Sequence, residues 1–504
     1  PALSLNFQLE SGKMKIADLT LENTTVMGDP DRDITSVDND SRTTQPGCLY
    51  AAFPGANVHG ANFAAQLVDQ GVRAFLTDPA GVEIMREAGL DLTDLTILVH
   101  EFPRAVAGRI AAQVYGTGQS PAMFGVTGTN GKTTTTFILD AFLQALGHTT
   151  GLIGTVATVI AGDRVDSVRT TPEASALHQL LARMRDAGVD TCSMEVSSHA
   201  LSQHRVDGVH FDVVSFTNLS QDHLDYHGTM DEYFNAKATL FTPEFASRGV
   251  VVLADDWARK LVSVSQIPVV TVSMNSEDKP DYLVARAETW ELHTPQGSIP
   301  FTPVLPGLFN VTNTALALVM LLEYGVPLDA VASIANGTEV VVPGRMEVVN
   351  AAHPRAIIDY SHTPDAIEKV LDRLSGDPVV VVVGAGGDRD STKRAAMGEA
   401  AARGADVVIV TDDNPRSEDP ASIRAQVLAG AREATGARAH TVEECENRGV
   451  AIRRAVELAG ANGTIVVAGK GHETGQEIAG EVLPFSDRDQ TREAIEAHVR
   501  DENR

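Results

Sequence analysis

Short apolar runs that end in polar residues alternate with amphipathic segments along most of this chain. In its central part the clearest runs are residues 189–195, 212–219 and 249–256. Runs of this length between helical segments are typical of parallel strands that are buried on both faces. The pattern therefore predicts an α/β protein. Because open α/β sheets bind ligands at the carboxyl ends of their strands, it also places candidate chemistry at the polar ends of the runs.

The alternation divides the chain into three predicted domains, residues 1–103, 104–343 and 344–504. The first is a small α/β unit, and the second is a mostly parallel sheet with an antiparallel ribbon over residues 282–301. The third restarts the alternation after Pro343-Gly344 as a doubly wound, Rossmann-like domain. Helices are expected at 62–71, 104–115, 365–374, 393–403, 421–434 and 447–459, and further strands at 73–78, 95–100, 356–359, 378–384, 406–411 and 463–468.

A glycine-rich stretch, residues 125–136, reads Gly-Val-Thr-Gly-Thr-Asn-Gly-Lys-Thr-Thr-Thr-Thr between an expected strand and an expected helix. Backbone N–H groups of such a loop, together with the helix N-terminus, bind phosphate. Lys132 would reach the outer phosphates of a nucleoside triphosphate, and the Thr133 hydroxyl would face Mg²⁺. The spacing departs from the usual motif, since five residues rather than four separate Gly125 from Gly131, and Val126 stands where the usual first glycine would be. The alternative is a glycine-rich turn with a chance Lys-Thr pair.

Three further side chains are candidates for metal or catalytic chemistry. Glu195 follows a buried strand, where a carboxylate facing the phosphate loop suits a hard cation such as Mg²⁺. His223 lies in an acid- and histidine-rich segment whose loose spacing and lack of cysteine do not favour zinc. Lys237 lies on an expected amphipathic helix, and its surroundings alone favour a surface lysine.

Composition indicates a soluble globular protein, with 43% hydrophobic and 21% charged residues among 504. No apolar run is long enough to span a bilayer, and no signal peptide is visible. The three cysteines, Cys48, Cys192 and Cys445, form neither a disulfide framework nor a zinc pattern, which fits a reducing cytosol. The net charge of −27 argues against a nucleic-acid partner.

Several motifs besides the loop Thr127-Gly-Thr-Asn-Gly-Lys-Thr133 occur in a fixed order. They are Thr170-Thr-Pro-Glu173, Glu195-Val-Ser-Ser-His199, Asp222-His-Leu-Asp-Tyr-His227, Asn235-Ala-Lys237, Gly307-Leu-Phe-Asn-Val-Thr-Asn313, Val342-Pro-Gly-Arg-Met-Glu347, Asp359-Tyr-Ser-His-Thr-Pro-Asp365, Gly386-Gly-Asp-Arg-Asp390, Asp413-Asn-Pro-Arg416 and Gly469-Lys-Gly-His-Glu473. In this order they resemble the Mur ligases, ATP-dependent amide-forming enzymes of peptidoglycan precursor synthesis. The resemblance covers nearly the whole chain and is nearest to the MurE type, which adds the third residue of the stem peptide.

The resemblance implies a reaction, its cofactors and the residues that carry it. ATP would phosphorylate the D-glutamate side-chain carboxylate of UDP-N-acetylmuramoyl-L-alanyl-D-glutamate, and an amine would displace the phosphate. Mg²⁺ is the implied cofactor, and Lys237 would be modified by CO₂ to a carbamate that holds a second Mg²⁺ with His223. The catalytic residues implied are Lys132, Glu195, His223 and Lys237, and the metal ligands are Thr133, Glu195, His223 and carbamylated Lys237.

The resemblance also implies three sets of binding residues. ATP would contact Thr127, Gly128, Thr129, Asn130, Gly131, Lys132, Thr133, Asn310, Arg345 and Asp359. The UDP-muramoyl dipeptide would contact Asn39, Ser41 and Asn57 of a UDP-binding first domain, and Thr170, Thr171, Ser197, Gln203 and Arg205 of the second. The incoming amino acid would contact Arg389, Asp413, Asn414, Pro415, Arg416, Gly469 and Glu473 of the third.

Arg416 indicates which amino acid is added. In the family the form Asp413-Asn-Pro-Arg416 accompanies meso-diaminopimelate, which differs from lysine by a carboxylate at its far end. A guanidinium forms a two-point pair with that carboxylate, whereas it would repel a lysine ammonium. Glu473 would accept a hydrogen bond from the distal ammonium. The alternative for Arg416 is a surface or helix-capping arginine.

Other functions stay open at this point. A lysine-adding ligase of the same family is disfavoured by Arg416. Folylpolyglutamate synthetases share the phosphate loop but lack Asp413–Arg416, and an inactive nucleotide-binding regulator is disfavoured by the intact catalytic set. The expected partners are small molecules alone, with no nucleic acid or membrane insertion, and the chain is expected to act as a monomer in the cytoplasm.

Overall fold

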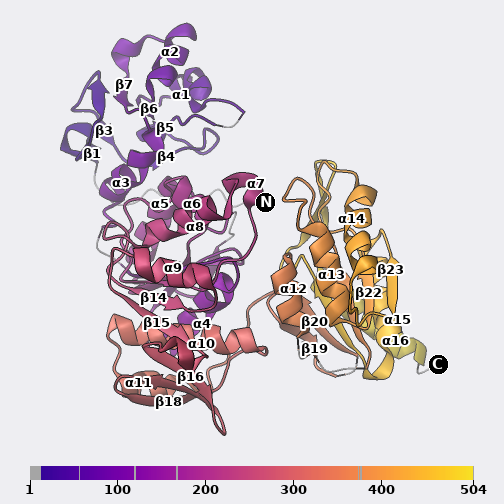
Figure 1. Ribbon diagram of the computed structural model, residues 1–504. Helices are drawn as coiled ribbons and strands as arrows, with labels where there is room; N and C mark the ends of the chain where they lie inside the picture. The colour runs from indigo at the N-terminus through magenta and orange to yellow at the C-terminus, as the bar shows by residue number, and fades with distance from the viewer. Residues whose placement is uncertain are drawn as a thin grey trace.

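The computed structural model describes residues 13–502 except 56, 119–120, 166–168, 353, 373 and 375–376. Figure 1 shows three α/β units, the first (indigo) next to the central unit (magenta) and the third (orange to yellow) beside the central unit. Each unit is built around its own sheet. In the described part of the chain, no helix combines the length and hydropathy that crossing a bilayer requires.

The first sheet has five strands in the order β2-β7-β6-β5-β4. All neighbours are parallel except β2 and β7. The strands are β2 (Thr25–Met27), β4 (Ser36–Asp38), β5 (Cys48–Ala51), β6 (Ala74–Thr77) and β7 (Thr96–Val99), beside a short antiparallel pair β1 (Met14–Lys15) and β3 (Asp33–Ile34). The helices are α1 (Ala64–Asp69), α2 (Pro79–Glu87) and α3 (Pro103–Tyr115). Val106 and Ile110 of α3 pack against Leu49 and Leu76, so this helix closes one face of the first sheet.

The central sheet has eleven strands in the order β11-β10-β9-β12-β8-β13-β14-β15-β16-β17-β18. Its strands are β8 (Ala122–Thr127), β9 (Thr150–Ile153), β10 (Thr158–Ile160), β11 (Asp163–Val165), β12 (Thr191–Glu195), β13 (Val213–Phe216), β14 (Gly249–Val252), β15 (Val269–Ser273), β16 (Tyr282–Arg286), β17 (Trp290–Thr294) and β18 (Gly297–Phe301). Strands from β9 to β16 in this order are parallel, while β16, β17 and β18 form the expected antiparallel ribbon. The phosphate loop thus leaves the middle of a parallel sheet.

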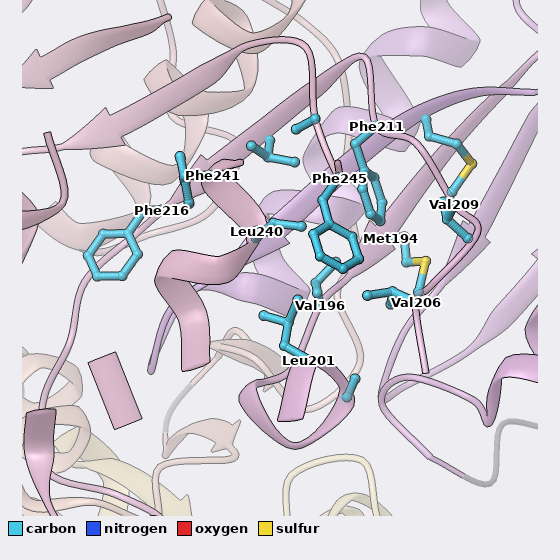
Figure 2. Packing of buried hydrophobic residues seen from close by; sticks show 14 of the residues in the cluster. Met194, Val196, Leu201, Val206, Val209, Phe211, Phe216, Leu240, Phe241 and Phe245 are labelled. Carbon is cyan, nitrogen blue, oxygen red and sulfur yellow. The ribbon is translucent and has the colours of Figure 1, made fainter. Parts of the chain in front are cut away.

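Helices cover both faces of the central sheet. They are α4 (Lys132–Ala145), α5 (Ala174–Asp186), α6 (Ser198–Ser202), α7 (Leu224–His227), α8 (Met230–Ala238), α9 (Asp256–Val264), α10 (Leu308–Tyr324) and α11 (Leu328–Ile334). Figure 2 shows Met194, Val196, Leu201 and Phe245 packed together in the core on one face. Because side chains alternate across a strand, Met194 and Val196 in this core leave Glu195 to project from the opposite face, toward α4.

The third sheet has six strands in the order β19-β20-β24-β21-β22-β23, and only β19 is antiparallel. The strands are β19 (Glu347–Asn350), β20 (Arg355–Asp359), β21 (Val379–Val383), β22 (Val407–Val410), β23 (Thr441–Glu444) and β24 (Thr464–Ala468). The helices are α12 (Pro364–Leu371), α13 (Arg394–Gly404), α14 (Pro420–Glu433), α15 (Arg448–Ala459) and α16 (Asp487–Glu502). A separate hairpin pairs β25 (Gly475–Ile478) with β26 (Glu481–Pro484). Three adjacent strands, β24, β21 and β22, bring their carboxyl ends to one edge.

The α/β fold class predicted from the sequence is confirmed, and each expected helix and strand overlaps an observed one. The alternation pattern gave no indication of β23 or of the β25–β26 hairpin. The domain boundaries stay predictions. Helix α3 packs into the core of the first unit and also contacts α5 of the central unit, so it lies where the two units meet.

A buried ion pair ties α15 to the start of α16. Arg448 and Asp487 are both fully buried, and Arg448 donates to the two carboxylate oxygens of Asp487 at 2.7 Å each. Arg448→Met would leave the Asp487 charge without its partner, so we expect unfolding to become easier by about 3–5 kcal/mol. Urea unfolding followed by circular dichroism measures this loss. Arg454→Gln, which removes exposed pairs to Glu443 and Glu457, is the control, and equal midpoints for both variants would contradict the prediction.

Candidate active site

The lysine of the phosphate loop is bonded to carbonyl groups of the same loop. Lys132, at the start of α4, donates to the carbonyl oxygens of Gly128 at 2.9 Å and Thr129 at 2.8 Å. Burial lowers the pKa of Lys132, while Glu195 and Asp222 act in the opposite direction. An anionic phosphate would offer this ammonium a better acceptor than a carbonyl does, because hydrogen bonds between ions are the stronger ones.

Gly128 is required at its position for a steric reason. Its φ is +141°, and a Cβ atom there would lie 1.9 Å from the Thr217 hydroxyl oxygen at the end of β13. The Thr217 hydroxyl donates to the Asn130 carbonyl at 2.6 Å, and the Asn130 N–H donates to the Asn218 side chain at 3.0 Å. The loop is therefore shaped by β13 as well as by the strand that precedes it.

Glu195 and Thr133 meet beneath the loop. Glu195 is 1% exposed, and its Oε2 accepts from the Thr133 hydroxyl at 2.9 Å. Its other oxygen accepts from the Thr155 N–H at 2.7 Å. These oxygens fit Mg²⁺, which is usually bound through one or two carboxylates with phosphates and water. Among the described residues no group of three or more His, Cys, Asp or Glu is placed to hold a metal, so phosphate oxygens would have to complete the shell.

Lys237 is buried, and the interpretation of it as a surface lysine is wrong. It is 1% exposed on α8, and its Nζ donates to the Gly128 carbonyl at 2.9 Å. The ammonium lies 4.6 Å from the centre of the Tyr233 ring, and no carboxylate in the described residues pairs with it. Burial, with the charge of Lys132 as a second cause, holds the pKa of Lys237 well below its ordinary value. The helical pattern could not show this, because the group that Lys237 contacts belongs to a loop about 100 residues earlier in the chain.

His223 and Asp222 join the loop region to the third unit. His223 has a left-handed backbone with φ of +55°, and burial lowers its pKa to about 3, which leaves the ring neutral. Asp222 accepts from Lys393 at 2.9 Å and lies 3.5 Å from His362, both of them in the third unit. Burial acts to raise the pKa of Asp222, but a hydrogen bond with His362 and the nearby charge of Lys393 hold that pKa well below its usual range. The motif containing Asp222 was recognised in the sequence, but its role as an inter-unit partner was missed.

A cavity of about 230 Å³ opens between the loop, α10 and the third unit. Most of the expected ATP residues line it, together with Thr170, Ser197, Glu195 and His223. Arg345 reaches across to the Thr133 hydroxyl at 3.3 Å and stacks 4.3 Å from the Tyr360 ring centre. Two of the lining residues also bind backbone groups. Asn310 donates to the Pro306 carbonyl at 2.6 Å, and Asp359 accepts from the Met346 N–H at 2.7 Å. Thr127, buried in β8, and Gly128 lie outside the cavity lining.

The expected dipeptide residues of the second unit form one connected network. The Thr171 hydroxyl donates to the Glu195 carbonyl at 2.8 Å and accepts from the Ser197 N–H at 3.2 Å. Arg205 donates to the Thr171 carbonyl at 3.2 Å and to Gln203 at 2.7 Å. The Thr170 hydroxyl accepts from Thr155, which also bonds Glu195, so this network touches the phosphate site directly.

The three expected residues of the first unit are not gathered into that network. Asn39 contacts the second unit, since its side-chain oxygen accepts from Ser175 of α5 at 2.9 Å. Ser41 is half-buried two residues further along, and Asn57 is exposed. They lie on the side of the first unit that carries the ends of β4 and β5.

The residues expected to bind the amino acid lie at the carboxyl ends of β21, β22 and β24. Asn414 donates to Glu473 at 2.8 Å, and Arg416 donates to the Gly387 carbonyl at 2.7 Å. Gly469, with φ of +112°, passes so close to Asp413 that a Cβ atom would lie 2.3 Å from its carboxylate. Arg389 is exposed on the loop that contains Gly387, and Pro415 is buried between Asn414 and Arg416. This cluster is separate from the cavity but adjoins it.

Lys470 is a member of this cluster that sequence reasoning missed. Its side chain is fully buried, and its ammonium donates to Asn414 at 2.9 Å and to Glu473 at 3.0 Å. Lys470 therefore positions Glu473 through one of its two carboxylate oxygens, Oε2. Next to it, the His472 ring lies 5.5 Å from that of Tyr360, which lines the cavity. The motif that contains Lys470 was a signal, but spacing alone does not show which of its residues points inward.

Comparison with known families covers most of the chain. Residues 126–321 match the Mur ligase middle domain, residues 344–471 the glutamate ligase domain of Mur ligases, and residues 33–113 the catalytic domain of the Mur ligase family. A solved structure of a UDP-N-acetylmuramoyl-L-alanyl-D-glutamate–2,6-diaminopimelate ligase, 30% identical, superposes with a TM-score of 0.63 over 93% of this chain and 96% of that one. A folylpolyglutamate synthase from Mycobacterium tuberculosis, 20% identical, has a TM-score of 0.58 over 72% of this chain and 91% of that one, and shows the fold alone.

Two curated relatives are similar over nearly their full length. The UDP-N-acetylmuramoyl-L-alanyl-D-glutamate–2,6-diaminopimelate ligase of Streptomyces avermitilis is 45% identical over 93% of this chain and 94% of its own. A UDP-N-acetylmuramyl-tripeptide synthetase of Leifsonia xyli is also 45% identical, over 93% of each chain. The chain therefore belongs to the Mur ligase family and is an ATP-dependent ligase that forms amide bonds.

Proposed function

We propose that this enzyme joins meso-diaminopimelate to the D-glutamate side-chain carboxylate of UDP-N-acetylmuramoyl-L-alanyl-D-glutamate during peptidoglycan precursor synthesis. The observation that carries the proposal is the position of Arg416 in the third unit, beside a cluster in which Glu473 offers a carboxylate. A distal carboxylate and a distal ammonium on one substrate match this arginine and this glutamate. Overall similarity is a weaker argument, because a tripeptide synthetase whose name leaves the amino acid open is equally similar.

The first step makes the carboxylate reactive. A carboxylate oxygen is a poor leaving group, so transfer of the γ-phosphoryl group of ATP to it gives an acyl phosphate and ADP. Lys132 and the backbone N–H groups of residues 131–133, at the start of α4, would offset the charge of the transferring group. The amine then attacks the acyl carbon, the tetrahedral intermediate expels phosphate, and the new amide nitrogen loses a proton. Thr170, Thr171 and Ser197 would hold the carboxylate beside the loop, where they line or adjoin the cavity.

Mg²⁺ is the cofactor that the donor set best fits. Thr133 and Glu195 would hold one ion, which supplies charge neutralisation for the phosphate oxygens when bound. His223, neutral at ordinary pH, and a carbamate on Lys237 would hold a second. The buried amine of Lys237 has no ion-paired carboxylate among the described residues, and burial lowers its pKa, which favours the neutral form that adds CO₂ and releases a proton.

We infer that the enzyme works on small molecules in the cytoplasm, as a monomer, without nucleic acid or membrane insertion. The free cysteines Cys48, Cys192 and Cys445 are compatible with a reducing compartment. The net charge of −27 supports the absence of a nucleic-acid partner, since a strongly acidic chain is repelled by nucleic-acid phosphates.

Phosphate release tests the function directly. Purified enzyme with ATP, Mg²⁺ and the UDP-muramoyl dipeptide should release phosphate with meso-diaminopimelate and much less with lysine, because lysine lacks the carboxylate that Arg416 would bind. Mass spectrometry of the product identifies the tripeptide. Equal rates with lysine would reject the proposed specificity, and no release with either amino acid would favour a nucleotide-binding regulator.

Lys237→Ala should reduce kcat by about 100-fold or more, because a carbamate near the phosphates would be lost. Short-chain carboxylates added to this variant should restore part of the activity by supplying oxygens in the space left by the side chain. Lys260→Ala, which removes a lysine ion-paired to Asp231 on the outside of the same region, is the matched control. Full activity of the untreated Lys237→Ala variant would contradict the carbamate.

Arg416→Ala should raise KM for meso-diaminopimelate by about 10- to 100-fold, since a charge-assisted two-point pair is removed. KM for ATP should change little, because Arg416 does not line the cavity. Arg403→Ala removes an exposed arginine of the same unit and should leave both constants unchanged. An unaltered KM for meso-diaminopimelate in Arg416→Ala would show that another group binds the distal carboxylate.

A further inference from the structure

The β25–β26 hairpin holds the backbone of Arg416 in place. The Arg416 N–H donates to the Glu477 carbonyl at 3.0 Å, and the Ala479 N–H donates to the Arg416 carbonyl at 2.7 Å. Arg416 has a left-handed backbone there, with φ of +53°. The Glu477 N–H in turn donates to the Asn414 side chain at 2.9 Å. Glu477 is therefore fixed by its backbone to two residues of the amino-acid cluster, and its side chain must lie close to Arg416.

The carboxylate of Glu477 pairs with the guanidinium of Arg416. Glu477 Oε2 lies 3.3 Å from Arg416 Nε, while Arg416 Nη1 is directed to the Gly387 carbonyl at 2.7 Å. A guanidinium offers a carboxylate two parallel N–H bonds along one edge. With Nη1 engaged elsewhere, the edge formed by Nε and Nη2 is the one left for a substrate carboxylate. Glu477 lies on that edge.

We propose that Glu477 is a specificity-determining residue that competes with the distal carboxylate of the substrate for Arg416. The inference rests on the proposed function, in which Arg416 binds that carboxylate. Glu477 is the group that the substrate displaces, and its side chain can move aside because it is 42% exposed, whereas that of Arg416 is 21% exposed. The displaced carboxylate goes to solvent, and its backbone contacts with Arg416 and Asn414 stay in place.

Glu477 also affects how strongly lysine is rejected. The distal ammonium of lysine would be repelled by a bare Arg416, but a carboxylate beside the guanidinium attracts it and cancels part of that repulsion. Glu477 therefore weakens meso-diaminopimelate binding and, at the same time, softens the discrimination against lysine. Removal of the Glu477 charge should therefore strengthen the binding of meso-diaminopimelate and weaken the binding of lysine.

The size of the effect follows from the exposure of the pair. Ion pairs that reach solvent are weak, so competition by Glu477 should cost about two- to fivefold in affinity. Glu477→Gln should lower KM for meso-diaminopimelate by that factor with little change in kcat, and should lower kcat/KM for lysine. A lower KM cannot result from misfolding, and Glu477→Ala, which keeps the same backbone contacts, should act in the same direction.

Steady-state kinetics of the full-length enzyme with both amino acids tests the proposal. Glu481→Gln is the matched control, because it removes the same charge from the exposed tip of the same hairpin, where it has no ion pair to Arg416. A fall in KM confined to the Glu477 variants supports the competition. An unchanged or higher KM in those variants, or an equal fall in Glu481→Gln, overturns it. If the unmodified enzyme gives no turnover with meso-diaminopimelate, the proposed function fails instead.

Discussion

The close passage of the phosphate loop beside β13 is the constraint on which the rest of the site depends. Gly128 leaves no room for a side chain against Thr217, and its carbonyl oxygen accepts from both Lys132 and Lys237. One backbone group thus brings together the two lysines to which the proposed mechanism assigns catalytic roles. Burial, followed by the charge of Lys132, lowers the pKa of Lys237, so the geometry that places both lysines at Gly128 favours the neutral amine.

Glu195 reaches the phosphate loop because its neighbours in the chain, Met194 and Val196, pack on the opposite face of the central sheet. Met194 and Val196 belong to one core, and Glu195 between them projects to the other side to meet Thr133. The dipeptide network is built on the same strand end, through the Glu195 carbonyl and the Ser197 N–H. Phosphate, metal and acceptor carboxylate would therefore share one rigid support, as an in-line transfer demands.

Much of this arrangement could be predicted from the sequence, because it is local in the chain. Strand, glycine loop and helix follow one another directly, and the polar residues at the ends of apolar runs lie where parallel strands place them. Lys237 could not be assigned from its helical pattern, since what buries it is a loop about 100 residues earlier. The pairing of Asn39 with Ser175, of Asp222 with Lys393, and of Arg416 with Glu477 likewise depends on contacts between distant segments.

In the proposed function, the third unit selects the amine that enters the reaction. Its cluster contains charges of both signs, with Lys470 beside Glu473 and Arg416 beside Glu477. A zwitterionic substrate end entering such a cluster exchanges one set of ion pairs for another, so the net gain is smaller than the sum of the new contacts. Affinity for the amino acid then depends on which internal pairs are solvent-exposed and easily broken. Lys470 is buried and Glu477 is exposed, so the pair between Arg416 and Glu477 should break more readily than the pair between Lys470 and Glu473.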